Sequence, residues 1–235
     1  MLQYPGLLQQ NLISELMAQG ITPDTEILPR RCRKDFLRGV VLNAHLNTWA
    51  VDTVGATNFA LKYYVGRARP EEVALSVKCS IDGNIFTPEC SNVFWLPPRT
   101  IPASIKRKVR RLKLDTMQSF TAYPEGSPIH PSFPAMHSAA SSLSLWLPVV
   151  ANLTPAQVEE TKKLDLAVAM ARSVAGVHYR DDNLAGLIIG QEIIARELPA
   201  YLQERYNADP EKVRQKIDNY RFDWRATADR LHNAS

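Results

Sequence analysis

The sequence predicts an all-α protein, a helical bundle formed by one domain. Apolar residues recur at helical spacing along most of the chain, prolines and capping residues mark helix ends, and only one short segment has a β-hairpin pattern. Of the 235 residues, 45% are hydrophobic and 22% are charged, which is typical of a globular protein with its own core. Because no repeat, low-complexity tract or interdomain linker interrupts the pattern, we expect residues 1–235 to form a single domain.

The expected helices follow one another along the chain. They cover residues 5–19, 32–62 (as one helix or two), 70–78, 103–120, 135–150, 154–174, 181–207 and 210–232. Pro70 and Pro155 stand at first helical positions, where an N–H group has no partner within the helix. Thr154 and Gln157 form a capping box, and Pro199 is expected to kink the helix that contains it.

Residues 79–104 are the exception to this helical pattern. They are rich in proline, asparagine, glycine and serine, and Asp82-Gly83 has the composition of a hairpin turn. Cys79 and Cys90 flank this turn and would pair across a hairpin in an oxidising compartment, but reduced structural cysteines are the favoured interpretation. Together with Cys32 they are too few and too scattered for a disulfide framework or a zinc site.

Charge and hydropathy limit the partners and the compartment. The net charge is +4, and basic residues are concentrated only in residues 105–115. We interpret that segment as the solvated face of a helix, so no nucleic-acid partner is expected. No apolar run approaches the roughly 18 residues that a membrane span needs. Because the N-terminus has no basic leader followed by an apolar run, we expect a cytoplasmic protein.

Three separated segments place cations and histidines where apolar helices end. In the first, Lys62 and Arg69 are seven residues apart, about two helical turns, so both side chains leave the same helix face. Pro70 follows directly. A basic pair at a helix C-terminus also interacts favourably with the helix dipole, and this structural interpretation stays open for the pair taken alone.

The second and third segments contain the histidines. His137 follows a proline-rich loop that begins near His130, and we expect it just inside a helix N-terminus, where free backbone N–H groups attract anions. In the third segment Arg172 precedes His178, and Asp182 stands four residues further on, where its carboxylate can hold one imidazole nitrogen. A histidine that caps a turn and a structural His–Asp pair also explain these residues when each segment is taken alone.

Taken together, the segments resemble the signature of the superfamily that contains the type 2 phosphatidic acid phosphatases, the class A bacterial acid phosphatases and the vanadium haloperoxidases. That signature reads K-x6-RP, then PSGH, then SR-x5-H-x3-D. The matching positions, in family order, are Lys62, Arg69, Pro70, Pro134, His137, Arg172, His178 and Asp182. The resemblance covers residues 62–182 and implies a helical bundle of the vanadium haloperoxidase and acid phosphatase type.

The resemblance also implies roles for the matched side chains. Lys62, Arg69 and Arg172 would neutralise the oxygens of a vanadate or phosphate ion, because three fixed cations balance most of the charge of such an ion. His178 would bind the central vanadium or phosphorus atom. Asp182 would orient the imidazole ring of His178.

The middle motif departs from the family pattern. His137, which the resemblance implies to be the acid–base residue, is preceded by Ala135 and Met136 in place of serine and glycine. Ala135 has no hydroxyl to donate to the oxyanion, a loss of roughly 1–3 kcal/mol. Met136 keeps a backbone N–H that can bind the oxyanion, but its side chain restricts the backbone angles open to glycine. Ala171 also stands where the family usually has serine.

Two chemistries suit this set of residues. One is hydrolysis of phosphate esters through a phosphohistidine. The other uses vanadate as cofactor to oxidise bromide or iodide with hydrogen peroxide, giving a hypohalous acid equivalent that passes to an organic acceptor. HPSFPAMHSA resembles the bromoperoxidase branch, in which a histidine stands seven positions before the acid–base histidine, as His130 does. His130 would then tune the activated peroxide; an exposed loop histidine is the simpler interpretation.

The surroundings of the other motifs, GRARPEE and AGVHYRDDN, also resemble haloperoxidases more than phosphatases. A haloperoxidase is therefore our first prediction and an acid phosphatase the second. Haloperoxidases of this type are usually longer chains with the motifs in their second half, so we expect this chain to form a homo-oligomer that covers the surfaces a first half would bury. A degenerate oxyanion-binding protein without turnover is the third interpretation, suggested by Ala135 and Met136.

Overall fold

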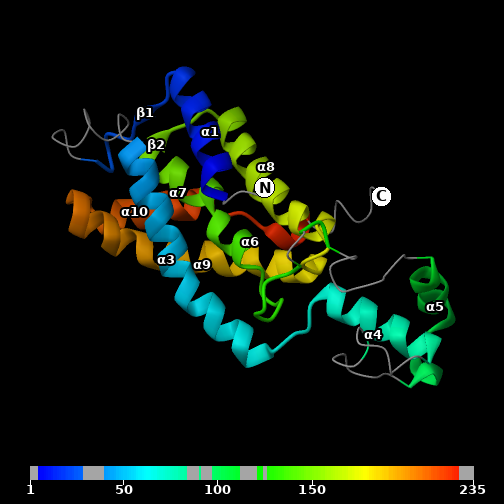
Figure 1. The fold of residues 1–235 in the computed structure, drawn as a ribbon. Helices are drawn as coiled ribbons and strands as arrows, with labels where there is room; N and C mark the ends of the chain where they lie inside the picture. Colours follow the sequence, from blue (N-terminus) through cyan, green and yellow to red (C-terminus); the bar gives the residue numbers. More distant parts are fainter. Residues whose placement is uncertain are drawn as a thin grey trace.

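Helices make up nearly all the regular structure of the computed structural model, which describes residues 5–28, 40–83, 90, 97–111, 121–123 and 126–227 (Figure 1). The helices are α1 (Pro5–Ala18), α3 (Val40–Val65), α4 (Pro70–Asp82), α5 (Ala103–Arg110), α6 (Met136–Ser141), α7 (Leu143–Val150), α8 (Pro155–Val174), α9 (Arg180–Tyr206) and α10 (Pro210–Tyr220), with a 3₁₀ turn at Pro98–Thr100. Two short strands, β1 (Thr22–Pro23) and β2 (Ala151–Asn152), pair antiparallel, with Thr22 opposite Asn152. The predicted all-α class is confirmed.

The main bundle is built around α6 and α7. Helix α6 packs against α3, α8 and α9, while α7 packs against α8, α9 and α10, as Figure 1 shows. Every residue of α7 is buried. The core at this centre includes Leu143, Trp146 and Ile194, none of which exposes side-chain surface. Removing these side chains from water is the main stabilising term for the bundle.

The expected single helix over residues 135–150 is wrong, because the chain breaks at Ser142, which has a positive φ of 24°. The cause is the buried carboxylate of Asp165 on α8. It accepts hydrogen bonds from the Ser141 hydroxyl at 2.5 Å and from the backbone N–H groups of Leu143 at 3.2 Å and Ser144 at 2.9 Å. Asp165 thus caps the start of α7, and the break sets the direction of α6, which carries His137.

Helices α4 and α5 lie to one side of the bundle in Figure 1. They share a small apolar core of their own, formed by Ala74, Val77, Ile101 and Val109. Helix α4 begins at Pro70, as the sequence predicts, with proline in its first turn. It then continues through Asp82, and Gly83 ends it in the left-handed conformation with φ 66°. The expected hairpin at Asp82-Gly83 is therefore wrong, because the pair forms a helix C-terminus.

Cys79 and Cys90 form a disulfide, with their Cα atoms 5.8 Å apart. The expectation of reduced cysteines is wrong for this pair. The physical reason is the end of α4 at Gly83, which lets the chain turn so that residue 90 returns to the helix.

Reduction of this disulfide is expected to lower the free energy of unfolding of the α4–α5 region by about 2–3 kcal/mol. The bond spans a sequence separation of 11 residues, and opening a loop of that size returns conformational entropy to the unfolded chain. Denaturant titrations with and without a thiol reductant measure the change. A variant with Cys79→Ser and Cys90→Ser together should not respond to the reductant, and a wild-type curve that the reductant leaves unchanged would contradict the prediction.

The remaining helices agree with the sequence except at the C-terminus. Helices α1, α8 and α9 confirm the expected segments, and the capping box of Thr154 and Gln157 is present. Helix α10 ends at Tyr220 instead of residue 232, and helical structure resumes at residues 224–227 after a break. In this break the Gln191 side chain bonds both the N–H and the carbonyl of Phe222 at 3.0 Å. Residues 29–39, 112–120 and 228–235, where other helix ends were expected, lie outside the described residues. Among the described helices, none has the length and apolar character to cross a membrane.

Candidate oxyanion site

The three segments that the sequence singles out come together where α3, α4, α6, α8 and α9 meet. Their side chains come from the last turn of α3 (Lys62), the N-cap of α4 (Arg69), the first turn of α6 (Met136, His137), the last turn of α8 (Arg172) and the start of α9 (His178, Asp182). Lys62, Arg69, Arg172 and His178 are all buried. The proline-rich loop before α6 adds His130, which is half-buried.

Lys62 is fully buried and ties α3 to the proline-rich loop. Its ammonium donates to the carbonyl oxygens of Pro131 and Ser132, both at 3.0 Å, and of Pro134 at 2.5 Å. These carbonyls occupy all three N–H groups of the ammonium. Lys62 therefore fixes the loop that leads to His137, and its charge acts on the site at the same time.

Arg69 links the second and third segments. Its Nε donates to the His130 carbonyl at 2.9 Å and its Nη1 to the Val177 carbonyl at 2.8 Å. The same guanidinium lies 3.1 Å from His130 Nδ1 and 3.5 Å from His178 Nε2. Burial lowers the pKa of Arg69, and the charge of Arg172 acts in the same direction. The guanidinium of Arg172 therefore lies near enough to Arg69 for the two charges to repel each other.

Arg172 is 4% exposed and lacks a full set of partners. Its Nη1 donates to the hydroxyl of Tyr123, but its buried Nε has no hydrogen-bond acceptor among the described residues. A buried guanidinium N–H without a partner is costly. An anion held beside Arg172 would supply the acceptor.

His178 is held by Asp182 on the first turn of α9. His178 Nδ1 lies 3.4 Å from Asp182 Oδ2, which also accepts from the Tyr179 N–H at 3.0 Å. Burial lowers the pKa of His178 to about 4, and the charges of Arg69 and Lys62 add to this, while the Asp182 hydrogen bond opposes it. At neutral pH the ring is therefore neutral. With its Nδ1–H directed to Asp182, the ring turns the Nε2 lone pair toward the site, where Arg69 Nη1 lies 3.5 Å away.

His137 is also neutral. Burial lowers the pKa of His137 to about 3, and the charge of Arg172 is the next cause, followed by His178, Lys62 and Arg69. A bound anion would relieve this repulsion and raise the pKa of His137 again. His137 is thus able to accept or donate a proton once the charge of the cluster is balanced.

Met136 does not fill the centre of the cluster. Its side chain packs against the main core, and its terminal methyl lies 3.5 Å from where a Cβ on Gly55 of α3 would stand. As the first residue of α6, Met136 has a backbone N–H without an acceptor within the helix.

Two residues of the site were missed by sequence reasoning. Arg67 donates from Nη1 to Asp182 Oδ1 at 2.8 Å and to Asp181 at 2.6 Å, and its guanidinium lies 4.3 Å from the centre of the Tyr179 ring. It completes the support of Asp182, and its position between two matched cations of the first motif was a signal that it belonged to the site. Tyr123, the partner of Arg172, gave no such signal.

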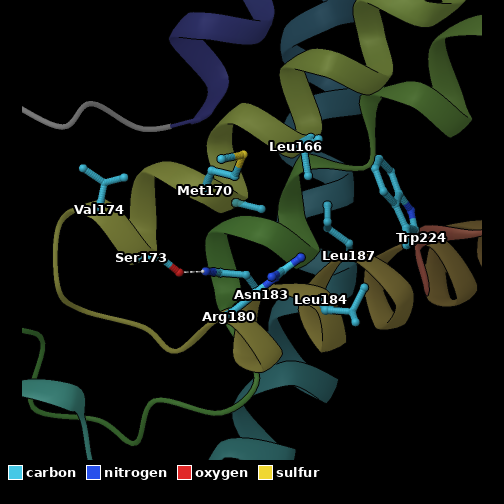
Figure 2. A pocket seen from close by; sticks show the side chains of 10 residues that line it. Leu166, Met170, Ser173, Val174, Arg180, Asn183, Leu184, Leu187 and Trp224 are labelled. Atoms are coloured by element: carbon cyan, nitrogen blue, oxygen red, sulfur yellow. Dashed lines mark hydrogen bonds between the residues drawn. The ribbon is translucent and has the colours of Figure 1, made fainter. Parts of the chain in front are cut away.

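A separate apolar cavity of about 360 Å³ lies between α8, α9 and Trp224 (Figure 2). Its walls include Leu166, Met170 and Leu187, and none of the matched motif residues lines it. On its wall Asn183 donates to the Ser173 hydroxyl at 2.8 Å. The cavity is therefore distinct from the cationic cluster.

A protein-family model agrees with this geometry. The model of the PAP2 superfamily matches residues 47–202, a range that contains all the residues of the cluster. The chain belongs to the PAP2 superfamily. No curated protein and no solved structure matches the chain.

Members of the PAP2 superfamily bind a phosphate or vanadate oxyanion at the active site, and the residues present here fit such an ion. The cluster combines buried cations with two neutral imidazoles, and the unpartnered Arg172 Nε is a donor that an oxyanion would satisfy. The phosphatases and the haloperoxidases of this superfamily share these oxyanion-binding residues, so other residues must distinguish the two activities.

The affinity of this PAP2 site for an oxyanion is expected to fall as the pH rises through about 7. Burial lowers the pKa of Lys62 to about 7, and the charge of Arg69 adds to the shift. Below that pH the ammonium is charged and attracts the anion; above it, binding must first take up a proton, so affinity falls by up to about tenfold per pH unit. Calorimetric titration with tungstate, which stays a dianion across the neutral range, measures this slope.

Lys62→Met is the control for this pH dependence. It removes the titrating amine, so the variant should bind tungstate more weakly and with a flatter pH profile. The same slope in the variant and the wild type would assign the pH dependence to another group.

Proposed function

We propose that the chain is a vanadate-dependent haloperoxidase that oxidises bromide or iodide with hydrogen peroxide to a hypohalous acid equivalent. The observation that carries this proposal is the position of His130. Its Nδ1 lies 3.1 Å from the Arg69 guanidinium, and its ring packs edge-on against Phe59 with the centroids 5.1 Å apart. A simple exposed loop histidine would have neither contact. His130 is the residue by which the loop resembles bromoperoxidases.

The proposed roles follow from the contacts. Lys62, Arg69 and Arg172 balance the charge of the oxyanion, and His178 binds its central atom through Nε2, which the bond to Asp182 leaves available. Vanadate bound there would activate hydrogen peroxide toward attack by a halide.

The protonation roles are assigned to the other two histidines. His137 is neutral in the free cluster; with its pKa raised by the bound anion, it would take up a proton and deliver it to an oxyanion oxygen. His130, next to Arg69, would tune the activated peroxide by a hydrogen bond from its ring. Burial lowers the pKa of His130, so a neutral ring with one N–H donor is expected at neutral pH.

The proposed partners are hydrogen peroxide, a halide and an organic acceptor, with a second copy of the chain as an oligomeric partner and no nucleic acid. The Cys79–Cys90 disulfide supports an oxidising compartment instead of the cytoplasm.

Acid phosphatase activity is the second candidate, supported by the neutral His178 with its Nε2 facing Arg69. Nε2 would attack phosphorus as the bond to the ester oxygen breaks, and His137 would donate a proton to the leaving alkoxide. Water would then hydrolyse the phosphohistidine and release inorganic phosphate.

Parallel assays separate these candidates. The protein is loaded with vanadate and given hydrogen peroxide, bromide and monochlorodimedone, while a second sample without vanadate is given p-nitrophenyl phosphate. The proposal expects bromination that depends on vanadate and bromide and that falls in a His130→Phe variant. Turnover of the phosphate ester alone would favour the phosphatase. Oxyanion binding without either turnover would favour the degenerate protein.

A further inference from the structure

Tyr123 is held against Arg172 by the segment that carries it. The Thr121 hydroxyl and the Ala122 N–H both donate to the Ala175 carbonyl at 3.0 Å, just beyond the end of α8. The Tyr123 N–H donates to the Thr121 hydroxyl at 3.2 Å. The guanidinium of Arg172 lies 5.2 Å from the centre of the Tyr123 ring, and its Nη1 donates to the phenol oxygen. The tyrosine is thus anchored to the same helix end as the arginine.

The hydrogen bond from Arg172 determines which further hydrogen bond the Tyr123 phenol can make. Because the oxygen accepts from the guanidinium, the phenol O–H must donate elsewhere. Among the described residues, no acceptor bonds this O–H, and the buried Nε of Arg172 also has none. The buried Arg172 Nε needs an acceptor, and an anion that supplies it would also lie within reach of the half-buried Tyr123 hydroxyl beside it.

We propose that the Tyr123 hydroxyl is a direct donor to the tetrahedral oxyanion held by Arg172. This inference rests on the proposed oxyanion function and adds a ligand to it from outside the three motifs. The phenol supplies a neutral hydroxyl donor to a site in which Ala135 has none. The opposite arrangement, in which Tyr123 competes with the anion for Arg172, predicts tighter anion binding once the hydroxyl is removed.

Tyr123→Phe is the test, because phenylalanine keeps the ring over Arg172 and removes only the hydroxyl. Tyr64→Phe is the matched control, since Tyr64 is 88% exposed at the end of α3. Calorimetry with tungstate should give about tenfold weaker binding for Tyr123→Phe and wild-type binding for Tyr64→Phe. A near-ultraviolet difference spectrum adds a direct readout, because a phenol that donates to an anion absorbs at longer wavelength.

The wild type and Tyr64→Phe should show this red shift on tungstate binding, and Tyr123→Phe should not. Thermal melting without anion checks that both variants fold. Equal or tighter binding in Tyr123→Phe, or a red shift that persists in it, would overturn the role of Tyr123 and leave the oxyanion site intact. A wild type that binds neither tungstate nor vanadate would overturn the oxyanion site and the tyrosine's role together.

Discussion

His178→Ala is expected to lower oxyanion-dependent turnover by roughly a thousandfold or more. The imidazole is the proposed nucleophile of the cluster and is uncharged at neutral pH, with Nδ1 held by Asp182 and Nε2 beside Arg69. Alanine removes the atom that we propose binds vanadium or phosphorus. Steady-state kcat, measured in whichever assay the wild type supports, gives the size of the effect.

His137→Ala is the matched control for this change. It removes a second neutral imidazole from the same cationic cluster, but one assigned to proton transfer. Tungstate affinity should therefore stay within a few-fold of the wild type in His137→Ala and fall in His178→Ala, while kcat falls in both. Full turnover in His178→Ala, or equal tungstate binding in both variants, would remove His178 from its proposed role.

Motif order and spacing predicted which side chains form the site, but not the hydrogen bonds that those side chains make. The resemblance to the family signature implied that Lys62, Arg69 and Arg172 belong to one cluster, because their order and spacing matched that signature. It gave no means of showing that Lys62 donates all three N–H groups to backbone carbonyls. That depends on the path of the proline-rich loop, and local rules do not determine the path of a loop with four prolines in fifteen residues.

Contacts between distant residues account for the other differences. The break at Ser142 lies inside a run of small and apolar residues that locally predicts one helix, and its cause, Asp165, is more than twenty residues away on α8. Asp82-Gly83 ends a helix in place of turning a hairpin, because a left-handed glycine serves either purpose and the apolar face shared with α5 decides between them. In each case the local sequence was compatible with two structures, and tertiary contacts determined which of them formed.

Gly190→Ala is expected to destabilise the protein by roughly 3 kcal/mol or more. A Cβ at this position of α9 would lie 2.0 Å from the Ala139 carbonyl oxygen and 2.8 Å from the Ala139 Cα on α6. The obstacle is backbone, which no rotamer change can move, so the two helices must separate. They also carry opposite halves of the site, joined by the bond from the Ala135 N–H to the Asp182 carbonyl at 2.9 Å. Oxyanion affinity should therefore fall together with stability.

Gly55→Ala is the control that separates this clash from the general effect of adding a methyl to a helical glycine. Its Cβ would meet only the flexible end of Met136 at 3.5 Å, an ordinary contact. Alanine is the better helix former, so Gly55→Ala should raise the free energy of unfolding by about 0.5–1 kcal/mol. Urea denaturation measures both variants. Gly190→Ala as stable as the wild type would mean that α6 and α9 are not in backbone contact, and the site that depends on their contact would lose its geometric basis.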